Sequence, residues 1–180
     1  MQPKLILETP RLTLRELTSS DTDDLFGIIG DADTMTYYPS PFTKEESGNW
    51  IAKSIRNYSE RGHGLWAVIL KAENKFIGQC GITIQDIDGS FVPEIGYHIN
   101  KHYHKKGFAT EASLACLKYG FENLELPEIF IHTWVKNIPS QRVAERSGLI
   151  KIKIYDKYIS SHDLTWPHIV YSLKADEYEK

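Results

Sequence analysis

The feature of this sequence that most constrains its fold is a change of hydrophobic period at Gly107. Before this glycine, short apolar runs in the middle of the chain follow one another with turn residues between them, which predicts a meander of β-strands. After it, apolar residues recur at helical spacing as far as Asn123, and strands and helices then alternate. This order predicts an α+β fold with a mixed sheet.

Local signals place the individual elements. Thr43-Lys-Glu-Glu46 is a capping box that predicts a helix, which Gly62 and Gly64 should end. The pair Asp88-Gly89 predicts a turn between antiparallel strands. We expect strands at 5–8, 11–15, 65–70, 75–84, 91–99, 129–135, 150–158 and 168–173, and helices after residue 20, after residue 43, after residue 107 and at 140–147. No linker, repeat or block of charge interrupts the chain, so we expect one domain that spans residues 1–180.

Composition excludes several classes of protein. The 180 residues are 41% apolar and 25% charged, the balance of a folded chain rather than a disordered one. There are 21 lysines and arginines against 24 aspartates and glutamates, and the net charge of −3 argues against a nucleic-acid-binding protein. The longest apolar run, 65–70, is far shorter than the roughly 20 residues of a membrane span. We therefore expect a cytoplasmic protein that binds neither nucleic acid nor membrane.

The most informative segment for function is the junction between the strand at 91–99 and the helix that begins at Gly107. A helix start carries unpaired N–H groups and the positive end of the helix dipole, which suit a phosphate. Gly107 and Ala109 would let an anion approach the backbone, and Lys105 and Lys106 add positive charge. An ordinary loop-to-helix junction would explain the same residues equally well.

The sequence of this junction resembles the acetyl-CoA pyrophosphate arm of the GCN5-related N-acetyltransferases (GNAT). The family pattern Gln/Arg-x-x-Gly-x-Gly/Ala is matched by His104-Lys-Lys-Gly107-Phe-Ala109. Thr9-Pro-Arg-Leu-Thr-Leu-Arg15 and Thr110-Glu111-Ala112 resemble the RimJ/RimL-like branch, the ribosomal-protein acetyltransferases. The segment from Asn137 to Gly148, Asn-x-x-Ser-x-x-Val-Ala-Glu-x-x-Gly, is similar to the second coenzyme motif of that branch.

One departure from the family pattern is His104, which stands in place of Gln or Arg, and Lys105 occupies a position where the branch often has Gly. Because main-chain N–H groups hold most of the phosphate, we expect coenzyme binding to survive both changes.

The resemblance implies a GNAT fold, a mixed and mostly antiparallel splayed sheet flanked by helices. It also implies transfer of an acetyl group from acetyl-CoA, without a metal, to a primary amine. The RimJ/RimL likeness favours a protein N-terminal α-amine as acceptor. The alternatives are a small amine such as a polyamine, an amino acid or an antibiotic, and a non-catalytic acyl-CoA-binding module. Monomer and homodimer both remain open. The expected coenzyme-binding residues are Ile99, His104, Lys105, Lys106, Gly107, Phe108, Ala109, Thr110, Asn137 and Ser140.

The resemblance also suggests groups for the chemical steps. A main-chain N–H near Ile99 would polarise the thioester if its strand is bulged, as it is in the family. Glu94 is the candidate base, acting through water, and a solvated strand glutamate is the alternative. Ser140 is the candidate acid that helps the thiolate leave, and a helix cap is the alternative. Tyr155 is the reserve acid, since other GNAT branches use a tyrosine after this helix.

Other conspicuous residues have simpler explanations. His98, His102 and His104 lack a carboxylate that would complete a metal site, so we expect no metal. Cys116 is expected to be a buried small apolar residue. Loop acids would be solvated or would attract a cationic amine: Asp31, Asp33, Asp86, Asp88 and Asp163. Five aromatic residues are expected in the core or in a pocket wall, with the core favoured: Tyr37, Tyr38, Phe42, Trp50 and Trp66. The polar and aromatic loops at 31–42 and 160–167 are of the kind that lines a substrate cleft.

Overall fold

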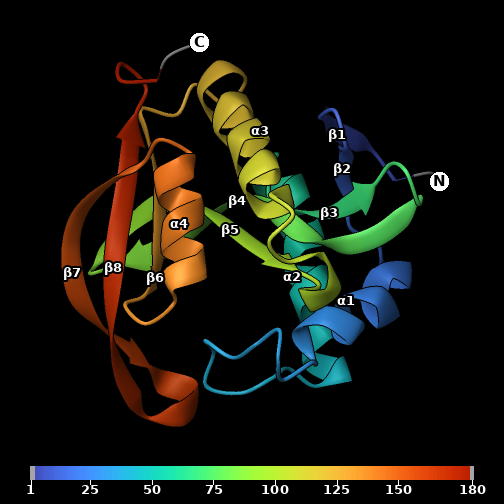
Figure 1. Ribbon diagram of the computed structural model, residues 1–180, viewed down its shortest axis with the longest axis horizontal. Helices are drawn as coiled ribbons and strands as arrows, with labels where there is room; N and C mark the ends of the chain where they lie inside the picture. Colours follow the sequence, from blue (N-terminus) through green and yellow to red (C-terminus); the bar gives the residue numbers. More distant parts are fainter. Residues whose placement is uncertain (1–2, 179–180) are drawn as a thin grey trace.

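The computed structural model describes residues 3–178, which form an eight-stranded mixed sheet with helices on both faces (Figure 1). The order across the sheet is β1-β2-β3-β4-β5-β6-β8-β7. The strands are β1 (Leu5–Glu8), β2 (Leu12–Glu16), β3 (Leu65–Leu70), β4 (Lys75–Ile87), β5 (Ser90–Ile99), β6 (Glu128–Trp134), β7 (Ile150–Ile159) and β8 (Leu164–Lys174). The α+β fold with a mixed, mostly antiparallel sheet is confirmed.

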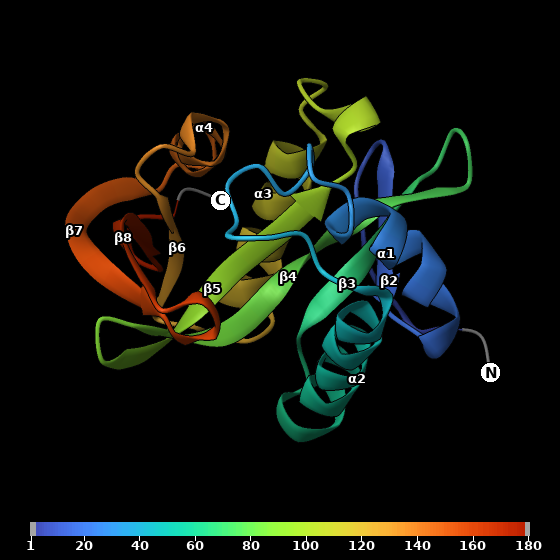
Figure 2. The same ribbon diagram turned by 90° about the horizontal axis from the view of Figure 1, so that it is seen from below.

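The helices divide between the two faces of the sheet. They are α1 (Thr22–Ile29), α2 (Lys44–Arg61), α3 (Phe108–Glu122) and α4 (Ile138–Arg146), with 3-10 turns η1 (Ser19–Asp21), η2 (Lys101–Tyr103) and η3 (Ser160–His162). Figure 2 shows α2 on the opposite side of the sheet from α3. None of the helices within residues 3–178 is long and apolar enough to cross a membrane.

Two separate cores explain why β3 is apolar at every position. Trp66 and Val68 belong to the core under α3, whereas Leu65 and Ala67 belong to the core that α1 and α2 cover. A strand with both faces covered loses the polar alternation of a half-exposed strand. Cys116 lies in the first of these cores and is fully buried, as expected.

The helix predicted from the capping box forms as expected. The Thr43 hydroxyl accepts from the Glu46 N–H, and the Glu46 carboxylate accepts from the Thr43 N–H at 2.7 Å. Gly62 ends α2 with a φ of 76°, the left-handed conformation that glycine adopts without steric cost.

The sheet opens between β5 and β6. These two parallel strands share a single residue pair, Glu94 with Phe130, and then diverge (Figure 2). The expected splay is therefore confirmed. The expected bulge is wrong, because β5 pairs with β4 from Ser90 to Ile99 without any shift of register.

The register of β5 determines which of its backbone groups face the opening. Asn100 N–H donates to the Ile77 carbonyl at 2.8 Å, and bonding partners alternate along an antiparallel pair. The even-numbered residues of β5 therefore bond to β4. The N–H groups of Tyr97 and Ile99 face the other way, toward the gap, without any need for a bulge.

Close approach of β4 to β5 at Gly78 gives a test of this packing. A Cβ at Gly78 would lie 2.2 Å from the His98 carbonyl oxygen, so we expect Gly78→Ala to lower the free energy of unfolding by about 1–3 kcal/mol. In α2 a Cβ at Gly48 would meet nothing nearer than 3.8 Å, so Gly48→Ala should raise it by about 0.5–1 kcal/mol. Urea unfolding measures the free energy of unfolding of each variant. Equal stability of Gly78→Ala and Gly48→Ala would contradict the close approach of β4 to β5 at Gly78.

Candidate active site

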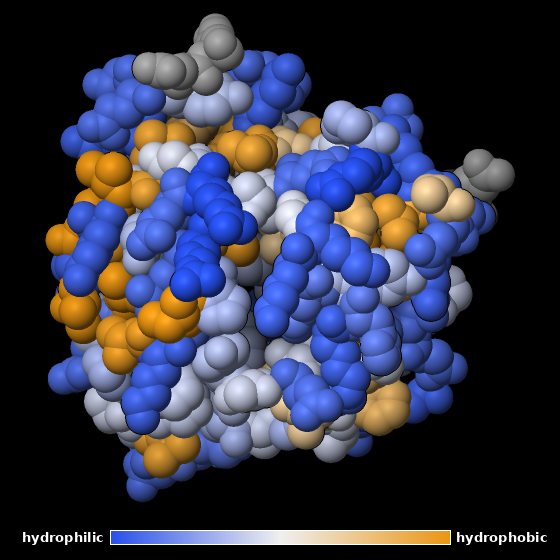
Figure 3. Space-filling view, in the orientation of Figure 1, coloured by the Kyte–Doolittle hydropathy of each residue, from blue (hydrophilic) through white to orange (hydrophobic). Residues whose placement is uncertain are grey.

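A cavity of about 1020 Å³ occupies the opening between β5 and β6. Its walls come from β5 and β6, the turn before α3, the start of α4, the segment 33–42, and the β7–β8 hairpin. Figure 3 shows the surface hollowed between α4 and the turn that precedes α3. The cavity therefore joins the helix start identified from the sequence to the unpaired edge of β5.

The start of α3 is open to an anion. Gly107 caps the helix with a φ of 82°, and no side chain accepts a hydrogen bond from the first turn. The Glu111 N–H donates to the Gly107 carbonyl and is the first N–H bonded within the helix. The N–H groups of Phe108, Ala109 and Thr110 precede it, and all three residues line the cavity. These groups can bind a phosphate by their N–H bonds and by the helix dipole.

The N-terminal motif holds this helix start in place. Glu111 lies in the first turn of α3, where its oxygens accept from the Thr9 hydroxyl at 2.6 Å and the Arg11 Nε at 2.6 Å. Burial alone would raise the pKa of Glu111, but these hydrogen bonds outweigh it and hold the pKa below its usual value. The Arg11 guanidinium also donates to the Lys106 carbonyl at 3.0 Å and lies over the Phe108 ring. Arg11 thus compensates the charge of Glu111 at a helix start that is open to an anion.

The residues before Gly107 have different surroundings. His104 lines the cavity and its Nε2 lies 2.7 Å from the Ile99 carbonyl oxygen, so it connects the turn to the end of β5. Lys105 lines the cavity with a φ of 61°. Lys106 lies outside the cavity wall, with its ammonium group 5.0 Å from the centre of the Tyr103 ring. Direct contact of Lys106 with the coenzyme therefore remains a prediction without geometric support.

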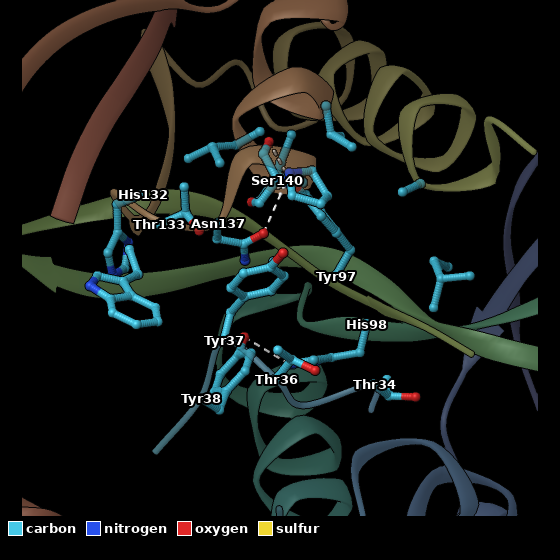
Figure 4. A pocket seen from close by; sticks show the side chains of 18 of the residues that line it. Thr34, Thr36, Tyr37, Tyr38, Tyr97, His98, His132, Thr133, Asn137 and Ser140 are labelled. Atoms are coloured by element: carbon cyan, nitrogen blue, oxygen red, sulfur yellow. Dashed lines mark hydrogen bonds between the residues drawn. The ribbon is translucent and has the colours of Figure 1, made fainter. Parts of the chain in front are cut away.

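Ser140 contacts both Asn137 and Tyr97 at the start of α4 (Figure 4). Asn137 is the N-cap, since its Oδ1 accepts from the Ser140 N–H at 3.1 Å. The cap expected as the alternative for Ser140 is thus formed by Asn137, and the Ser140 hydroxyl lies 2.9 Å from the Tyr97 hydroxyl. Burial raises the pKa of Tyr97 far above its usual value, so the phenol stays protonated.

Glu94 occupies the opposite face of β5. Its side chain is 11% exposed, and its Oε1 lies 2.7 Å from Nδ1 of His132 on β6. The alternative of a solvated strand glutamate is therefore wrong. Tyr155 packs near His132, with ring centres 6.2 Å apart, but it does not line the cavity. Its role as an acid stays a prediction.

Four of the five aromatic residues take the pocket-wall alternative, since all four line the cavity: Tyr37, Tyr38, Phe42 and Trp50. Phe42 and Trp50 also pack against the core that α1 and α2 cover. Only Trp66 of that set is fully buried in the core. Three of the four wall residues come from the segment 31–43, which the sequence predicted to line a substrate cleft. Trp134 and Trp166, stacked with ring centres 4.3 Å apart, add a further aromatic wall. Trp166 belongs to the loop 160–167 expected at a cleft, whereas no sequence signal pointed to Trp134.

The histidines near Ile99 are kept apart by separate partners. His98 Nδ1 lies 3.0 Å from Gln79 Nε2, and His98 Nε2 lies 2.8 Å from the Tyr38 hydroxyl. Burial lowers the pKa of His98 to about 4, so the ring is neutral at pH 7. Within residues 3–178 no group of His, Cys, Asp and Glu side chains is arranged to hold a metal ion.

The loop acids are engaged elsewhere. Asp31 and Asp33 accept from the Lys101 ammonium at 2.8 and 2.7 Å, and Asp88 accepts from Lys153 at 2.7 Å. Asp163 accepts from the Tyr158 hydroxyl at 3.0 Å. These contacts leave the attraction of a cationic amine by these acids without support.

Comparison with known proteins identifies the family. The family described as "Acetyltransferase (GNAT) domain" matches residues 11–150, which is most of the chain. This chain belongs to the GNAT acetyltransferases. It is an acyltransferase, and GNAT enzymes take their acetyl group from acetyl-CoA.

Similar proteins within the GNAT family cover nearly the full chain. The uncharacterized N-acetyltransferase YnaD of Bacillus subtilis (strain 168) is 30% identical over 173 residues, 96% of this chain and 98% of its own. A GNAT-family acetyltransferase from Bacillus anthracis has a TM-score of 0.80 at 30% identity, covering 95% and 99%. A provisionally assigned ribosomal-protein-serine acetyltransferase from Vibrio cholerae has a TM-score of 0.79 at 25% identity, covering 97% and 99%.

The open start of α3 gives a second test. Gly107→Glu would place a carboxylate at the expected pyrophosphate site, so we expect the affinity for CoA to fall by at least about tenfold, since charge repulsion replaces N–H donation. Gly89→Glu is the matched control, because Gly89 also has a positive φ, 80°, but lies in the β4–β5 turn. Calorimetric titration with CoA measures both, and wild-type affinity in Gly107→Glu would refute the site.

Proposed function

We propose that this GNAT enzyme acetylates the N-terminal α-amine of a protein. The observation that carries the proposal is that each acid lining the cavity already has one carboxylate oxygen in contact with a partner within the protein. Asp33 accepts from Lys101 at 2.7 Å, Glu46 accepts from the Thr43 N–H at 2.7 Å, and Glu94 contacts His132 at 2.7 Å. A polyamine would bring a second positive charge, whereas Asp33, Glu46 and Glu94 already contact Lys101, the Thr43 N–H and His132. A peptide N-terminus brings one charge followed by neutral backbone, which suits the aromatic and hydroxyl-bearing walls.

Two further considerations support an α-amine. Its reference pKa is about 8, against about 10.4 for a lysine, so a useful fraction is already neutral at pH 7. The similar protein from Vibrio cholerae carries the name of a ribosomal-protein-serine acetyltransferase, and the N-terminal motif resembles the RimJ/RimL-like branch of the family.

The coenzyme in this proposal extends from α3 to the open edge of β5. The pyrophosphate binds the N–H groups of Phe108, Ala109 and Thr110, and the pantetheine lies along β5 as an added strand. Asn137 uses its Oδ1 for the cap of α4, so its Nδ2 is the group left to donate to a pantetheine carbonyl. The N–H of Ile99 faces the gap and is a suitable donor to the thioester oxygen.

The two faces of β5 separate the two proton transfers. Glu94, on the face that carries His98, takes a proton from the acceptor ammonium directly or through water. The amine nitrogen then attacks the thioester carbon, and the C–S bond breaks as the tetrahedral intermediate collapses. On the other face, the hydroxyl pair of Ser140 and Tyr97 supplies a proton to the departing sulfur.

A small amine remains the second candidate. The stacked pair Trp134 and Trp166 and the rings of Tyr37, Tyr38 and Trp50 would pack against a flat small molecule.

Acceptor preference is measured with a panel of amines and acetyl-CoA, with release of free thiol as the signal. We expect short peptides with a free N-terminus to be acetylated, and the same peptides blocked at the N-terminus but containing an internal lysine to be inert. Spermidine is the polyamine probe and should react poorly. Turnover of spermidine or of a flat aromatic amine without turnover of the peptides would replace the peptide acceptor with a small one.

Removal of the base has a distinct kinetic signature. Glu94→Gln should lower kcat by about 10²- to 10⁴-fold and leave the affinity for acetyl-CoA unchanged, because a general base acts on the acceptor and not on the coenzyme. Ser140→Ala should cost about tenfold, since a thiol with a pKa near 8.5 is already a tolerable leaving group. Full kcat in Glu94→Gln across the pH range would place the base elsewhere and leave the family assignment intact.

A further inference from the structure

Three side chains from three strands form a row at the edge of the cavity. Lys157 Nζ on β7 lies 2.8 Å from His132 Nε2 on β6, and His132 Nδ1 lies 2.7 Å from Glu94 Oε1 on β5. The main-chain N–H of His132 also reaches the same carboxylate oxygen, at 3.5 Å. All three residues line the cavity.

The hydrogen-bonding chemistry of this row has one consistent arrangement. A lysine ammonium can only donate, so Nε2 of His132 accepts from it; a carboxylate can only accept, so Nδ1 carries the proton toward Glu94. Both ends therefore favour the same neutral tautomer of the imidazole, with its proton on Nδ1. The 2.7 Å approach of this buried Nδ1 to Oε1 is an ion-pair distance and not an aligned hydrogen bond, and Nδ1 has no hydrogen-bond partner within residues 3–178.

The arrangement leaves Glu94 with one oxygen fixed and one available. Oε1 faces His132, whereas Oε2 accepts no hydrogen bond from the described residues. An oriented imidazole next to a carboxylate is a known way to hold a reactive group in one geometry. In the usual arrangement a carboxylate orients an imidazole, and the imidazole takes part in the reaction. Here we infer the opposite: the imidazole of His132 orients the carboxylate of Glu94, and the carboxylate takes part in the reaction.

We propose that His132 and Lys157 are positioning residues for Glu94, with His132 orienting the carboxylate and Lys157 fixing the tautomer of His132. This inference rests on the proposed function, since it assigns to Glu94 the removal of the acceptor's proton. The proton moves from the ammonium to Oε2 and then to solvent, and His132 keeps its Nδ1 proton throughout.

The charges around the row agree with this role. The Lys157 ammonium and the Glu94 carboxylate contact the two different ring nitrogens of His132. Burial lowers the pKa of Lys157, while the charges of Glu94 and Asp86 oppose that change. Burial also lowers the pKa of His168 on β8 to about 4, so that ring is neutral. The other titratable groups near the row are Tyr155 on β7, Tyr38 in the segment 31–43, Tyr97 and His98 on β5, and Asp88 in the β4–β5 turn.

The first test needs no acceptor. In protein labelled with ¹⁵N-histidine, we expect His132 to show the Nδ1–H tautomer at pH 7, the reverse of the form that predominates for a free imidazole side chain. The resonance is assigned by its loss in His132→Asn. An Nε2–H tautomer would overturn the proposal, whether or not any amine is acetylated.

The second test is the pH dependence of kcat/KM with the best acceptor of the panel. His132→Leu should move the acidic limb to higher pH by about one unit, which is about a tenfold loss on the acidic side, because Glu94 loses its donor. His132→Asn should restore most of this shift, since the amide nitrogen of asparagine takes the place of Nδ1. A merely structural role of His132 would lower the rate without moving the limb.

Lys157 has a matched control on its own strand. Lys157→Met should also move the limb to higher pH, whereas Lys153→Met removes the same charge from a residue that pairs with Asp88 and should keep the wild-type limb. An unmoved limb in both His132→Leu and Lys157→Met would overturn the proposal. Absence of turnover with every amine would instead refute the proposed function, and the tautomer measurement would still decide the geometry.

Discussion

The divergence of β5 from β6 is the constraint on which the rest of this structure depends. The two strands share one residue pair, and beyond Glu94 the edge of β5 has no strand beside it. Buried backbone N–H groups that lack a partner are costly, so an opening of this kind persists where a ligand satisfies them. In a GNAT enzyme that ligand is acetyl-CoA. The cavity, the unpaired N–H groups of Tyr97 and Ile99, and the positions of α3 and α4 all follow from the divergence.

Residues of the N-terminal segment bind and neutralise a carboxylate at the start of α3. A glutamate in the first turn of an anion-binding helix would repel a phosphate, yet Glu111 is tied to Thr9 and Arg11. The same arginine donates to the Lys106 carbonyl, so it also supports the turn before the helix. These contacts explain why the segment 9–15 and the segment 104–112 both resemble the RimJ/RimL-like branch. The two segments are hydrogen-bonded to each other and together form the start of α3.

Strand alternation divides the chemistry of the proposed reaction. Successive residues of β5 point to opposite faces, so Glu94 and His98 lie on one face and Tyr97 on the other. A base for the ammonium and a proton donor for the sulfur can then approach a thioester from different sides without neutralising each other. The aromatic segment 31–43 covers the base side, and α4 covers the sulfur side.

The sequence by itself determined most of the helices and strands, and it pointed to the helix start at Gly107 as the candidate coenzyme site. The capping box at Thr43, the Asp88-Gly89 turn and the change of period at Gly107 act through neighbours a few residues away, so local chemistry decides them. Only the tertiary structure placed His132 against Glu94, Tyr97 against Ser140, and four aromatic rings in the cavity wall. Each of these contacts joins strands, helices and loops that are distant in the sequence, and each depends on register and on the angle at which β5 and β6 separate. Residue spacing along the chain does not reveal the register or the angle between β5 and β6, because both depend on how the helices and the sheet pack against one another.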